Sequence, residues 1–414
     1  MRIVHVSDCY LPRLGGIELQ VHDLACRQAA AGHEVAILTT TAAGGAPAHL
    51  GNAVEVVRAA SDRRTPEKIV YRSTRRGTAA LLSRLEEFDA VHVHASSFSP
   101  LAFLAAHHAS GRGVPSVATV HSLWAKATPL FRAADWLTGW GDWQVVWSAV
   151  SNAAAASLRS IVGGKAPVTI VPNGVDPEEW RVAPAPPRAD ALRVAAVSRL
   201  ARRKRLLQLV EMLHAAHDQL PEGLSLDVRI LGEGPQRKDI ERYLRRHDME
   251  AWVHLLGRRS RAEIRSVFAE SDLFMAPASL ESFGIAALEA RCAGLPVVAL
   301  AGTGVQDFVA HGREGWLVRS DAAMVETIVS LARSPEVVAH VAAHNRSVPA
   351  SISWHGVLAQ CEDLYGQASV MHGRRWTPAP PVRPAQRRAA PGPSQRDSAQ
   401  GRLADEQARV VFDR

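Results

Sequence analysis

The sequence predicts an α/β protein made of two doubly wound parallel-sheet domains in tandem. Residues 1–40 alternate between an apolar strand (1–8), a helix (17–31) and a second strand (33–40), and a similar alternation begins again after residue 191. The chain of 414 residues is also too long for one ordinary core. Its 47% hydrophobic and 21% charged residues are typical of a globular protein rather than a disordered or membrane-embedded one.

The first helix is predicted from its spacing. Ile17, Val21, Leu24 and Ala25 stand at i, i+4, i+7 and i+8, which puts them on one face, and Gly32 follows the helix. A strand, helix, strand unit of this size favours parallel pairing. The first half continues with predicted strands over 90–94, 116–121, 145–151 and 168–171.

The second half repeats the pattern after a Pro/Ala-rich segment. Its predicted strands cover 192–198, 227–231, 254–256, 273–276 and 297–300, and its clearest helices cover 206–217, 324–332 and 355–369. We therefore expect a first domain over 1–181, a linker over 182–191 and a second domain over 192–354. A terminal helix over 355–370 is expected to pack back on the first domain, and a disordered tail is expected over 371–414.

The positive charge is concentrated in that tail. The formal net charge is +7, but the tail holds nine arginines against four acidic residues, a net of +5, which leaves +2 for all the rest. A solvated tail is the favoured interpretation of this charge, with attraction to an anionic membrane surface or an acidic partner as the alternative, and nucleic acid is not expected as a partner.

Localisation follows from what the chain lacks. No apolar run approaches the roughly 20 residues of a membrane span, and the N-terminus predicts a strand rather than a signal peptide. The four cysteines lie far apart, with no metal-ligand spacing. We expect a cytoplasmic protein, with contact at the inner membrane face as an open alternative, and we expect neither a metal nor a cofactor.

Open parallel sheets bind ligands beyond the carboxyl ends of their strands, so the loops after strands are the places to search. Gly15 and Gly16 open the first helix, where free backbone N–H groups favour anions, although paired glycines often only make a turn. The loop lacks GxGxxG and the second strand ends without an acid, which disfavours a nicotinamide site.

The second domain offers two stronger candidates. Arg199 and Lys204 follow its first strand, where they could clamp a diphosphate or form a solvated basic run. In the segment ESFGIAALEA, Glu281 stands at the start of a helix expected from about Ser282, with Glu289 roughly 10 Å farther along at ~1.5 Å per residue. Two such carboxylates could hold two sugar rings, or could serve as a cap and an ion-paired side chain.

Histidines and tryptophans are the remaining candidates. His121 ends an apolar strand, and a lone histidine is more often structural than catalytic. His92 and His94 share a strand face, but with no third ligand apparent, sheet packing is favoured over a metal. Trp136, Trp140 and Trp143 stand at helical spacing, where core packing is favoured over a membrane-interface or acceptor-binding face.

Taken together, these segments resemble the retaining GT-B glycosyltransferases of family 4, from residue 1 to about residue 369. The most specific mark is the pair Glu281 and Glu289 with seven residues between them, and the Arg–x4–Lys element precedes it in the family's order. Four further marks fit: the Gly-Gly loop, VPNGVD (171–176), LGEGP (231–235) and HGREGWLV (311–318).

The resemblance implies a function and a role for each matching residue. It implies sugar transfer from a UDP-, GDP- or ADP-sugar to an unidentified small-molecule, glycan or glycolipid acceptor, with retention of anomeric configuration and without a metal, the donor lying between the two domains. Catalytic roles fall to His121, Arg199, Lys204 and Glu281. The remaining donor-binding residues would be Gly15, Gly16, Gly232, Leu256, Phe283, Gly284, Ile285 and Glu289.

Three positions depart from the family pattern, and other functions stay open. Ser198, Arg205 and Ser282 stand where glycine is commoner, which bears on donor preference rather than on the class. The alternatives are a nucleotide-sugar epimerase, a sugar phosphorylase and a non-catalytic sugar-nucleotide binding protein. A phosphorylase would need a lysine-linked cofactor, and nothing marks such a lysine.

Overall fold

The computed structural model describes residues 1–13, 15–43, 49–50, 54–58, 75–188 and 190–374. The chain forms two compact units, one of residues 1–94, 99–117 and 365–414 and the other of residues 95–98 and 118–364, with the tail after residue 374 outside the described residues. The expected tail disorder therefore stays a prediction, as do the expected domain boundaries.

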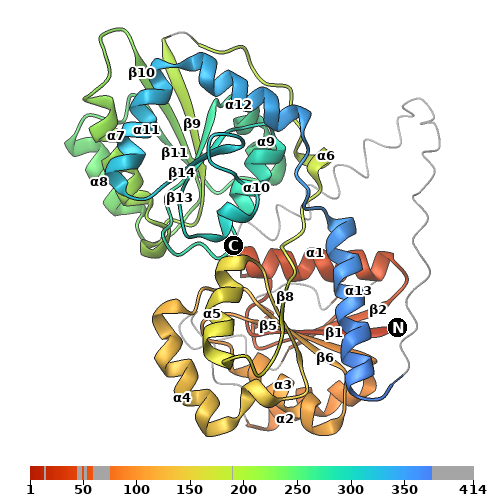
Figure 1. The fold of residues 1–414 in the computed structure, drawn as a ribbon. Helices are drawn as coiled ribbons and strands as arrows, with labels where there is room; N and C mark the ends of the chain where they lie inside the picture. Colours follow the sequence, from red (N-terminus) through yellow and green to blue (C-terminus); the bar gives the residue numbers. More distant parts are fainter. Residues whose placement is uncertain (14, 44–48, 51–53, 59–74, 189, 375–414) are drawn as a thin grey trace, which may run out of the picture. The chain divides into compact units, whose positions relative to one another are not determined.

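The first sheet has the order β3-β4-β2-β1-β5-β6-β7-β8. β1 pairs in parallel with both β2 and β5, whereas the short β3 pairs antiparallel with β4. The strands are β1 (Arg2–Ser7), β2 (Glu34–Thr39), β3 (His49–Leu50), β4 (Val54–Arg58), β5 (Ala90–Ala95), β6 (Ser116–Val120), β7 (Val146–Ala149) and β8 (Val168–Ile170). The helices among them are α1 (Gly16–Ala30), α2 (Arg75–Ser83), α3 (Pro100–Arg112), α4 (Thr128–Thr138) and α5 (Asn152–Val162) (Figure 1).

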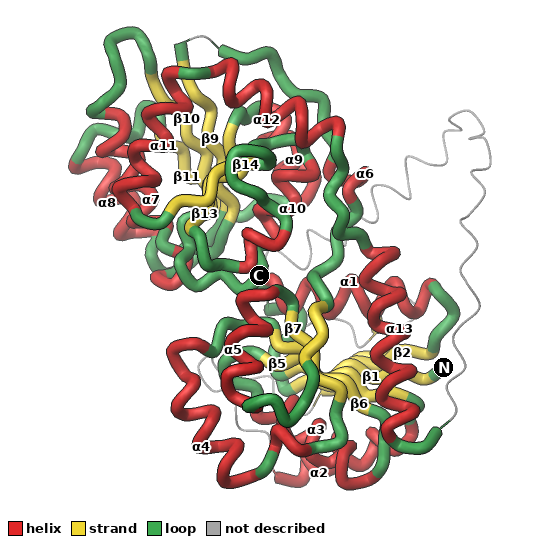
Figure 2. Tube along the Cα trace, viewed as in Figure 1, coloured by secondary structure: helices red, strands yellow, loops and turns green. Residues whose placement is uncertain are grey.

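The second sheet is parallel and has the order β11-β10-β9-β12-β13-β14. Its strands are β9 (Ala191–Val197), β10 (Ser225–Leu231), β11 (Val253–Gly257), β12 (Leu273–Ala276), β13 (Val297–Leu300) and β14 (Gly315–Val318). The helices are α6 (Pro177–Trp180), α7 (Leu206–His217), α8 (Arg237–Arg246), α9 (Arg261–Ala269), α10 (Ile285–Cys292), α11 (Asp321–Arg333), α12 (Pro335–Ser347) and α13 (Trp354–Met371). Figure 2 shows the strands of this sheet running side by side among the helices. Both sheets confirm the predicted fold class of two Rossmann-like parallel-sheet domains.

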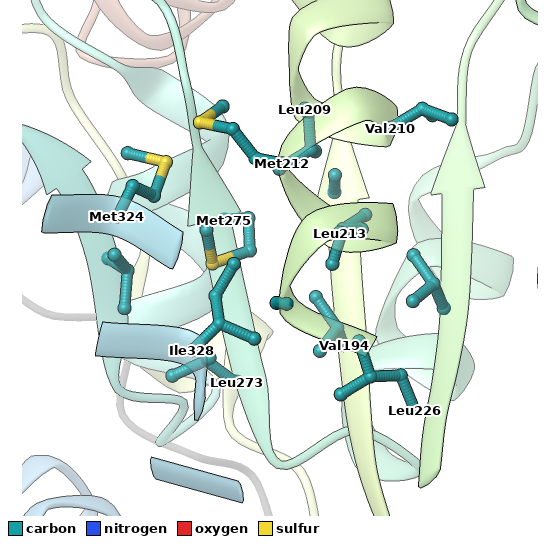
Figure 3. Packing of buried hydrophobic residues seen from close by; sticks show 14 of the residues in the cluster. Val194, Leu209, Val210, Met212, Leu213, Leu226, Leu273, Met275, Met324 and Ile328 are labelled. Atoms are coloured by element: carbon teal, nitrogen blue, oxygen red, sulfur yellow. The ribbon is translucent and has the colours of Figure 1, made fainter. Parts of the chain in front are cut away.

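Each sheet is stabilised by helices that bury an apolar face against it. In the first, Val21 and Ala25 of α1 are fully buried against Val35 and Ile37 of β2, which confirms the face predicted from spacing. In the second, Leu209 and Leu213 of α7 cover Val194 of β9, with Met324 and Ile328 of α11 beside them (Figure 3). Burying one such side chain contributes ~1.5–3 kcal/mol, and this packing holds the strand ends in place.

The tryptophan-rich segment differs from the prediction of one packed helix. α4 ends at Thr138 because Gly139 adopts a left-handed φ of 61°, so the predicted helical spacing is broken. Trp140 is buried and packs edge-on against Trp147 with ring centroids 5.0 Å apart, whereas Trp136 is 84% exposed. Core packing is therefore right for Trp140 and wrong for Trp136.

Candidate functional site

The order of the second sheet creates a switch point between β9 and β12. The strands β10 and β11 lie on one side of β9, and β12, β13 and β14 lie on the other. Ligands of doubly wound sheets bind outside the carboxyl ends of strands at such a point. The loop after β9 carries Arg199 and Lys204, and the loop after β12 carries Glu281. Two segments that are far apart in sequence therefore meet at the expected position.

Lys204 and Glu281 are in direct contact there. The Nζ of Lys204 donates a hydrogen bond of 2.6 Å to Oε2 of Glu281, and both side chains are mostly buried, with 24% and 17% exposed. An ammonium group has three donors, so Lys204 can keep this carboxylate and still donate to an anionic ligand. The pair thus holds a cation and a carboxylate side by side.

Arg199 is a second cation in the loop after β9 that also carries Lys204. Its side chain is exposed and, among the described residues, forms no ion pair. The backbone that carries it is held tightly, because Ser198 N donates to Leu231 O at 3.0 Å and Leu200 N donates to Glu233 O at 2.9 Å. The loop is therefore rigid while the guanidinium is free to meet a ligand.

Glycines of the LGEGP segment make this close approach of two loops possible. Gly232 has a φ of 137°, and a Cβ added there would overlap the carbonyl oxygen of Ser198. Gly232 N donates to Gly257 O at 2.7 Å, which places it beside the end of β11, where the half-buried Leu256 lies. The structure thus gives Gly232 a positioning role, while its predicted direct contact with the donor stays a prediction.

Arg205 explains one departure from the family pattern. It precedes α7 with a left-handed φ of 59°, a conformation that favours glycine. Its guanidinium donates to Pro277 O at 3.1 Å and to Asp321 Oδ2 at 2.5 Å. Contacts to the segment after β12 and to α11 therefore offset the backbone cost, and they tie the Lys204 loop to that segment.

The helix after Glu281 begins later than predicted. The prediction placed its start near Ser282, but α10 begins at Ile285 because Gly284 has a left-handed φ of 93°. Gly304 N donates to Glu281 O at 2.8 Å, and the buried Phe283 packs against Phe308 with centroids 5.5 Å apart. Glu281 thus lies in a fixed turn before the helix, farther from its first residue than predicted.

The start of α10 remains suited to anions. No side chain caps it, so the first backbone N–H groups of the helix, beginning at Ile285, can donate to a ligand. Glu289 lies farther along α10 and is half-buried. Its predicted contact with a ribose, like the predicted contacts of Phe283 and Gly284 with the donor, stays a prediction.

His121 directly follows β6, as predicted. Its side chain is buried, with 6% exposed, and burial lowers its pKa to about 4. The imidazole is therefore neutral at physiological pH and can act as a hydrogen-bond partner rather than as a cation. Its predicted contact with the transferred sugar stays a prediction.

Gly15 and Gly16 precede or open α1, as predicted, but an acid already occupies the space there. A Cβ on Gly15 would overlap the carboxylate of Glu18, which is buried and forms an ion pair with Arg13 Nε at 3.3 Å. This carboxylate offsets part of the positive potential of the helix start. The glycines of this loop therefore let a ligand come close to the backbone, but the loop offers little positive charge.

A third imidazole, which sequence reasoning missed, joins His92 and His94. His5 on β1 lies beside them, and the ring nitrogens of all three approach within 4.8 Å, a spacing that could hold a metal ion. However, His5 already uses both nitrogens, at 3.0 Å from His94 Nε2 and 2.6 Å from Gln28 Oε1. No signal in the sequence joins His5 to this pair, because the pairing of β1 with β5 is a property of the folded sheet.

This histidine cluster is closed by the last helix. Gln28 Nε2 donates to the hydroxyl of Tyr365 at 2.9 Å, and that hydroxyl lies 2.9 Å from Nδ1 of His92. Burial lowers the pKa of His5 to about 4, so its ring is neutral and has one donor and one acceptor. These hydrogen bonds occupy both ring nitrogens of His5 and Nδ1 of His92. We interpret the cluster as a buried hydrogen-bond network, called the histidine lock below, that holds α13 in place.

Comparisons with known proteins place the chain in a family. The family model described as glycosyltransferase family 4 matches residues 14–179, and the model described as glycosyl transferases group 1 matches residues 180–348. One subunit of the human phosphatidylinositol N-acetylglucosaminyltransferase is 26% identical over 387 residues, covering 89% of this chain and 76% of the relative. Glycogen synthase of Mycobacterium tuberculosis is 27% identical over 352 residues, covering 76% of this chain and 81% of the relative.

Solved structures show the same fold. Sucrose-phosphate synthase from Thermosynechococcus elongatus matches with a TM-score of 0.72 at 19% identity, covering 89% of this chain and 99% of that one. The Anabaena protein HepE in complex with UDP-glucose matches with a TM-score of 0.69 at 19% identity, covering 89% of this chain and 100% of that one.

The fold and the two family matches define a glycosyltransferase enzyme of the GT-B fold. The chain belongs to glycosyltransferase family 4, with the two matched regions following each other from residue 14 to residue 348. No helix of the described part of the chain has the length and apolar character needed to cross a membrane.

Proposed function

We propose that this glycosyltransferase takes its sugar from a nucleoside-diphosphate sugar and holds the donor diphosphate at the switch point between β9 and β12. One observation carries the proposal: the 2.6 Å contact of Lys204 with Glu281, which unites a cation and a carboxylate from the two loops. A UDP-, GDP- or ADP-sugar presents the matching groups, a diphosphate for the cation and sugar hydroxyls for the carboxylate.

The charges suit departure of the diphosphate. Negative charge grows on the diphosphate as the bond to the sugar breaks, and Arg199, Lys204 and the first amides of α10 would stabilise it. These donors are held in place by the tight loop after β9 and by the turn at Gly284, so little reorganisation is needed. Two cations and a helix start can supply the charge stabilisation that a metal ion supplies elsewhere, which is why we propose transfer without a metal or other cofactor.

Glu281 would position the transferred sugar. Its carboxylate keeps one oxygen on Lys204, which leaves lone pairs for the hydroxyls of the sugar ring. From the family resemblance we propose retention by a front-face route, in which the departing phosphate takes the proton of the acceptor hydroxyl. The acceptor is then a hydroxyl-bearing small molecule, glycan or glycolipid, and we place the reaction in the cytoplasm.

The proposal is tested by measuring transfer and donor hydrolysis with a panel of UDP-, GDP- and ADP-sugars, in the presence and absence of EDTA. The wild type should consume one donor class with EDTA present and should give a product of unchanged anomeric configuration by NMR. Loss of turnover in EDTA, an inverted product, or release of a C-epimer without transfer would each contradict a stated part of the proposal.

A further inference from the structure

The short helix α4 turns an apolar face outward. Leu130, Trp136 and Leu137 are 71%, 84% and 72% exposed, and Ala133 between them is exposed as well. At about 100° per residue these side chains share roughly one third of the helix circumference. Helices of globular proteins normally turn such a stripe toward the core, so α4 is reversed relative to that pattern.

The opposite side of α4 fixes this orientation. Asp135 is buried, accepts from Gly141 N at 2.6 Å and forms an ion pair with Lys165 at 3.0 Å. Phe131 stacks on the buried Trp124 with ring centroids 4.2 Å apart. The helix is anchored through its polar and aromatic contacts, and its apolar face is therefore held in the exposed position.

The segment from α4 to β8, which carries this face, has a small positive charge. Residues 128–170 contain three cations and two carboxylates, and both carboxylates, Asp135 and Asp142, contact Lys165. Arg132 and Arg159 donate only to the carbonyl oxygens of Ser160 and Val168, so neither has a carboxylate partner among the described residues. A partner that binds this face should therefore have an apolar layer for its side chains and negative charge for the two arginines.

We propose that the face of Leu130, Ala133, Trp136 and Leu137 inserts into the interfacial layer of a membrane rich in anionic lipids. Trp136 lies at headgroup depth, where the indole ring is favoured, and the two leucines lie deeper. Arg132, at the edge of the face, pairs with lipid headgroups. The inference stands on the exposure of α4 and is independent of the proposed donor chemistry.

Flotation of the full-length protein with vesicles tests this surface. The wild type should float with phosphatidylcholine vesicles containing phosphatidylglycerol and much less with phosphatidylcholine alone. The variant Trp136→Ser/Leu137→Ser should lose at least about tenfold in partitioning, because two apolar insertions are removed. Val370→Ser is the matched control, since Val370 is 71% exposed on α13, outside this face, and its change should leave flotation unaltered.

Further arms separate the other sources of binding. The full-length variant Arg387→Gln/Arg388→Gln tests the basic tail, and it should keep most of the flotation. The inference is overturned if the double α4 variant floats like the wild type, if Val370→Ser loses as much, or if binding follows the tail arginines alone. It is equally overturned if sedimentation shows a wild-type dimer that the α4 variant dissociates, since the face would then bind a second copy.

Discussion

Lys204 and Glu281 are 77 residues apart in the sequence, yet their side chains meet at 2.6 Å because β9 and β12 are neighbours in the sheet. Neither loop alone distinguishes a ligand site from ordinary surface charge. Their meeting at the switch point of the sheet does, because a cation and a carboxylate are held together at the position where this fold binds ligands.

The first prediction concerns Lys204. Lys204→Ala should lower kcat by about 10²–10³, because a donor to the developing charge on the diphosphate is removed. Arg203→Ala is the matched control, since Arg203 is an exposed cation in the same basic run and should change the rate less than about twofold. Steady-state kinetics with the preferred donor measure both, and equal losses in the two variants would contradict a specific role for Lys204.

The second prediction concerns Gly232. Gly232→Ala should destabilise the protein by several kcal/mol, because the new Cβ would overlap the Ser198 carbonyl and the φ of 137° is unfavourable. Gly223→Ala is the control, because Gly223 also has a positive φ, 84°, but open space around it, and should cost only about 1 kcal/mol. Urea unfolding gives both values, and similar losses would show that the close approach of the loops is unimportant.

The third prediction concerns Arg205. Replacing it with alanine removes its contacts with Pro277 and Asp321 while keeping the left-handed φ of 59°, whereas glycine removes the same contacts and relieves the backbone. Arg205→Gly should therefore be more stable than Arg205→Ala by about 1 kcal/mol in thermal unfolding. An alanine variant as stable as the glycine variant would contradict the strain assigned to this position.

The fourth prediction concerns the histidine lock. Tyr365→Phe removes the hydroxyl that joins Gln28 to His92, and should cost about 1–3 kcal/mol because a buried donor and acceptor lose their partner. Tyr243→Phe, which removes a hydroxyl hydrogen-bonded to the half-buried His214, should cost less. Equal midpoints for wild type and Tyr365→Phe in urea would show that the lock contributes nothing.

The fifth prediction concerns pH. Burial lowers the pKa of His5 and of His121 from 6.5 to about 4, so the unfolded chain binds more protons between these values. Both histidines are neutral in the folded and in the unfolded chain above pH 6.5, so they do not reduce the free energy of unfolding there. As the pH falls toward 4, protonation favours the unfolded chain, and each histidine lowers the free energy of unfolding by about 3 kcal/mol. Burial raises the pKa of Asp8 from 3.8 to about 6, which acts in the opposite sense over pH 4–6.

The two histidines outweigh Asp8, so the free energy of unfolding should fall on acidification from pH 6.5 to 4. His121→Gln should flatten this fall, and Asp8→Asn should steepen it, because the opposing contribution is gone. Urea unfolding across this range measures all three proteins. A wild type whose stability is constant or rises on acidification would contradict the assigned shifts.

The fold was largely predictable because its signals are local. The spacing of Val21, Leu24 and Ala25, the glycine that ends α1 and the run of apolar strands all lie within short windows. The ends of helices were harder to predict where a single glycine sets them. Gly284 moves the start of α10 to Ile285, and Gly139 ends α4. The spacing of apolar residues does not show which glycines adopt a left-handed backbone conformation.

The site was predictable in composition but not in contacts. The resemblance assigned Lys204 and Glu281 to one donor site, but their direct contact appears only in the structure, where β9 and β12 are neighbours. The third histidine, His5, escaped notice because it lies 87 residues from His92 and the pairing of β1 with β5 is a property of the folded sheet. The exposure of Trp136 was missed for a different reason, since its helix was expected to continue past residue 138.

The most direct test is a crystal structure of the protein with its nucleoside diphosphate bound. We expect diphosphate oxygens within hydrogen-bonding distance of Lys204 Nζ and of a backbone N–H in the first turn of α10. A diphosphate bound elsewhere, with Lys204 still contacting only Glu281, would contradict the central claim.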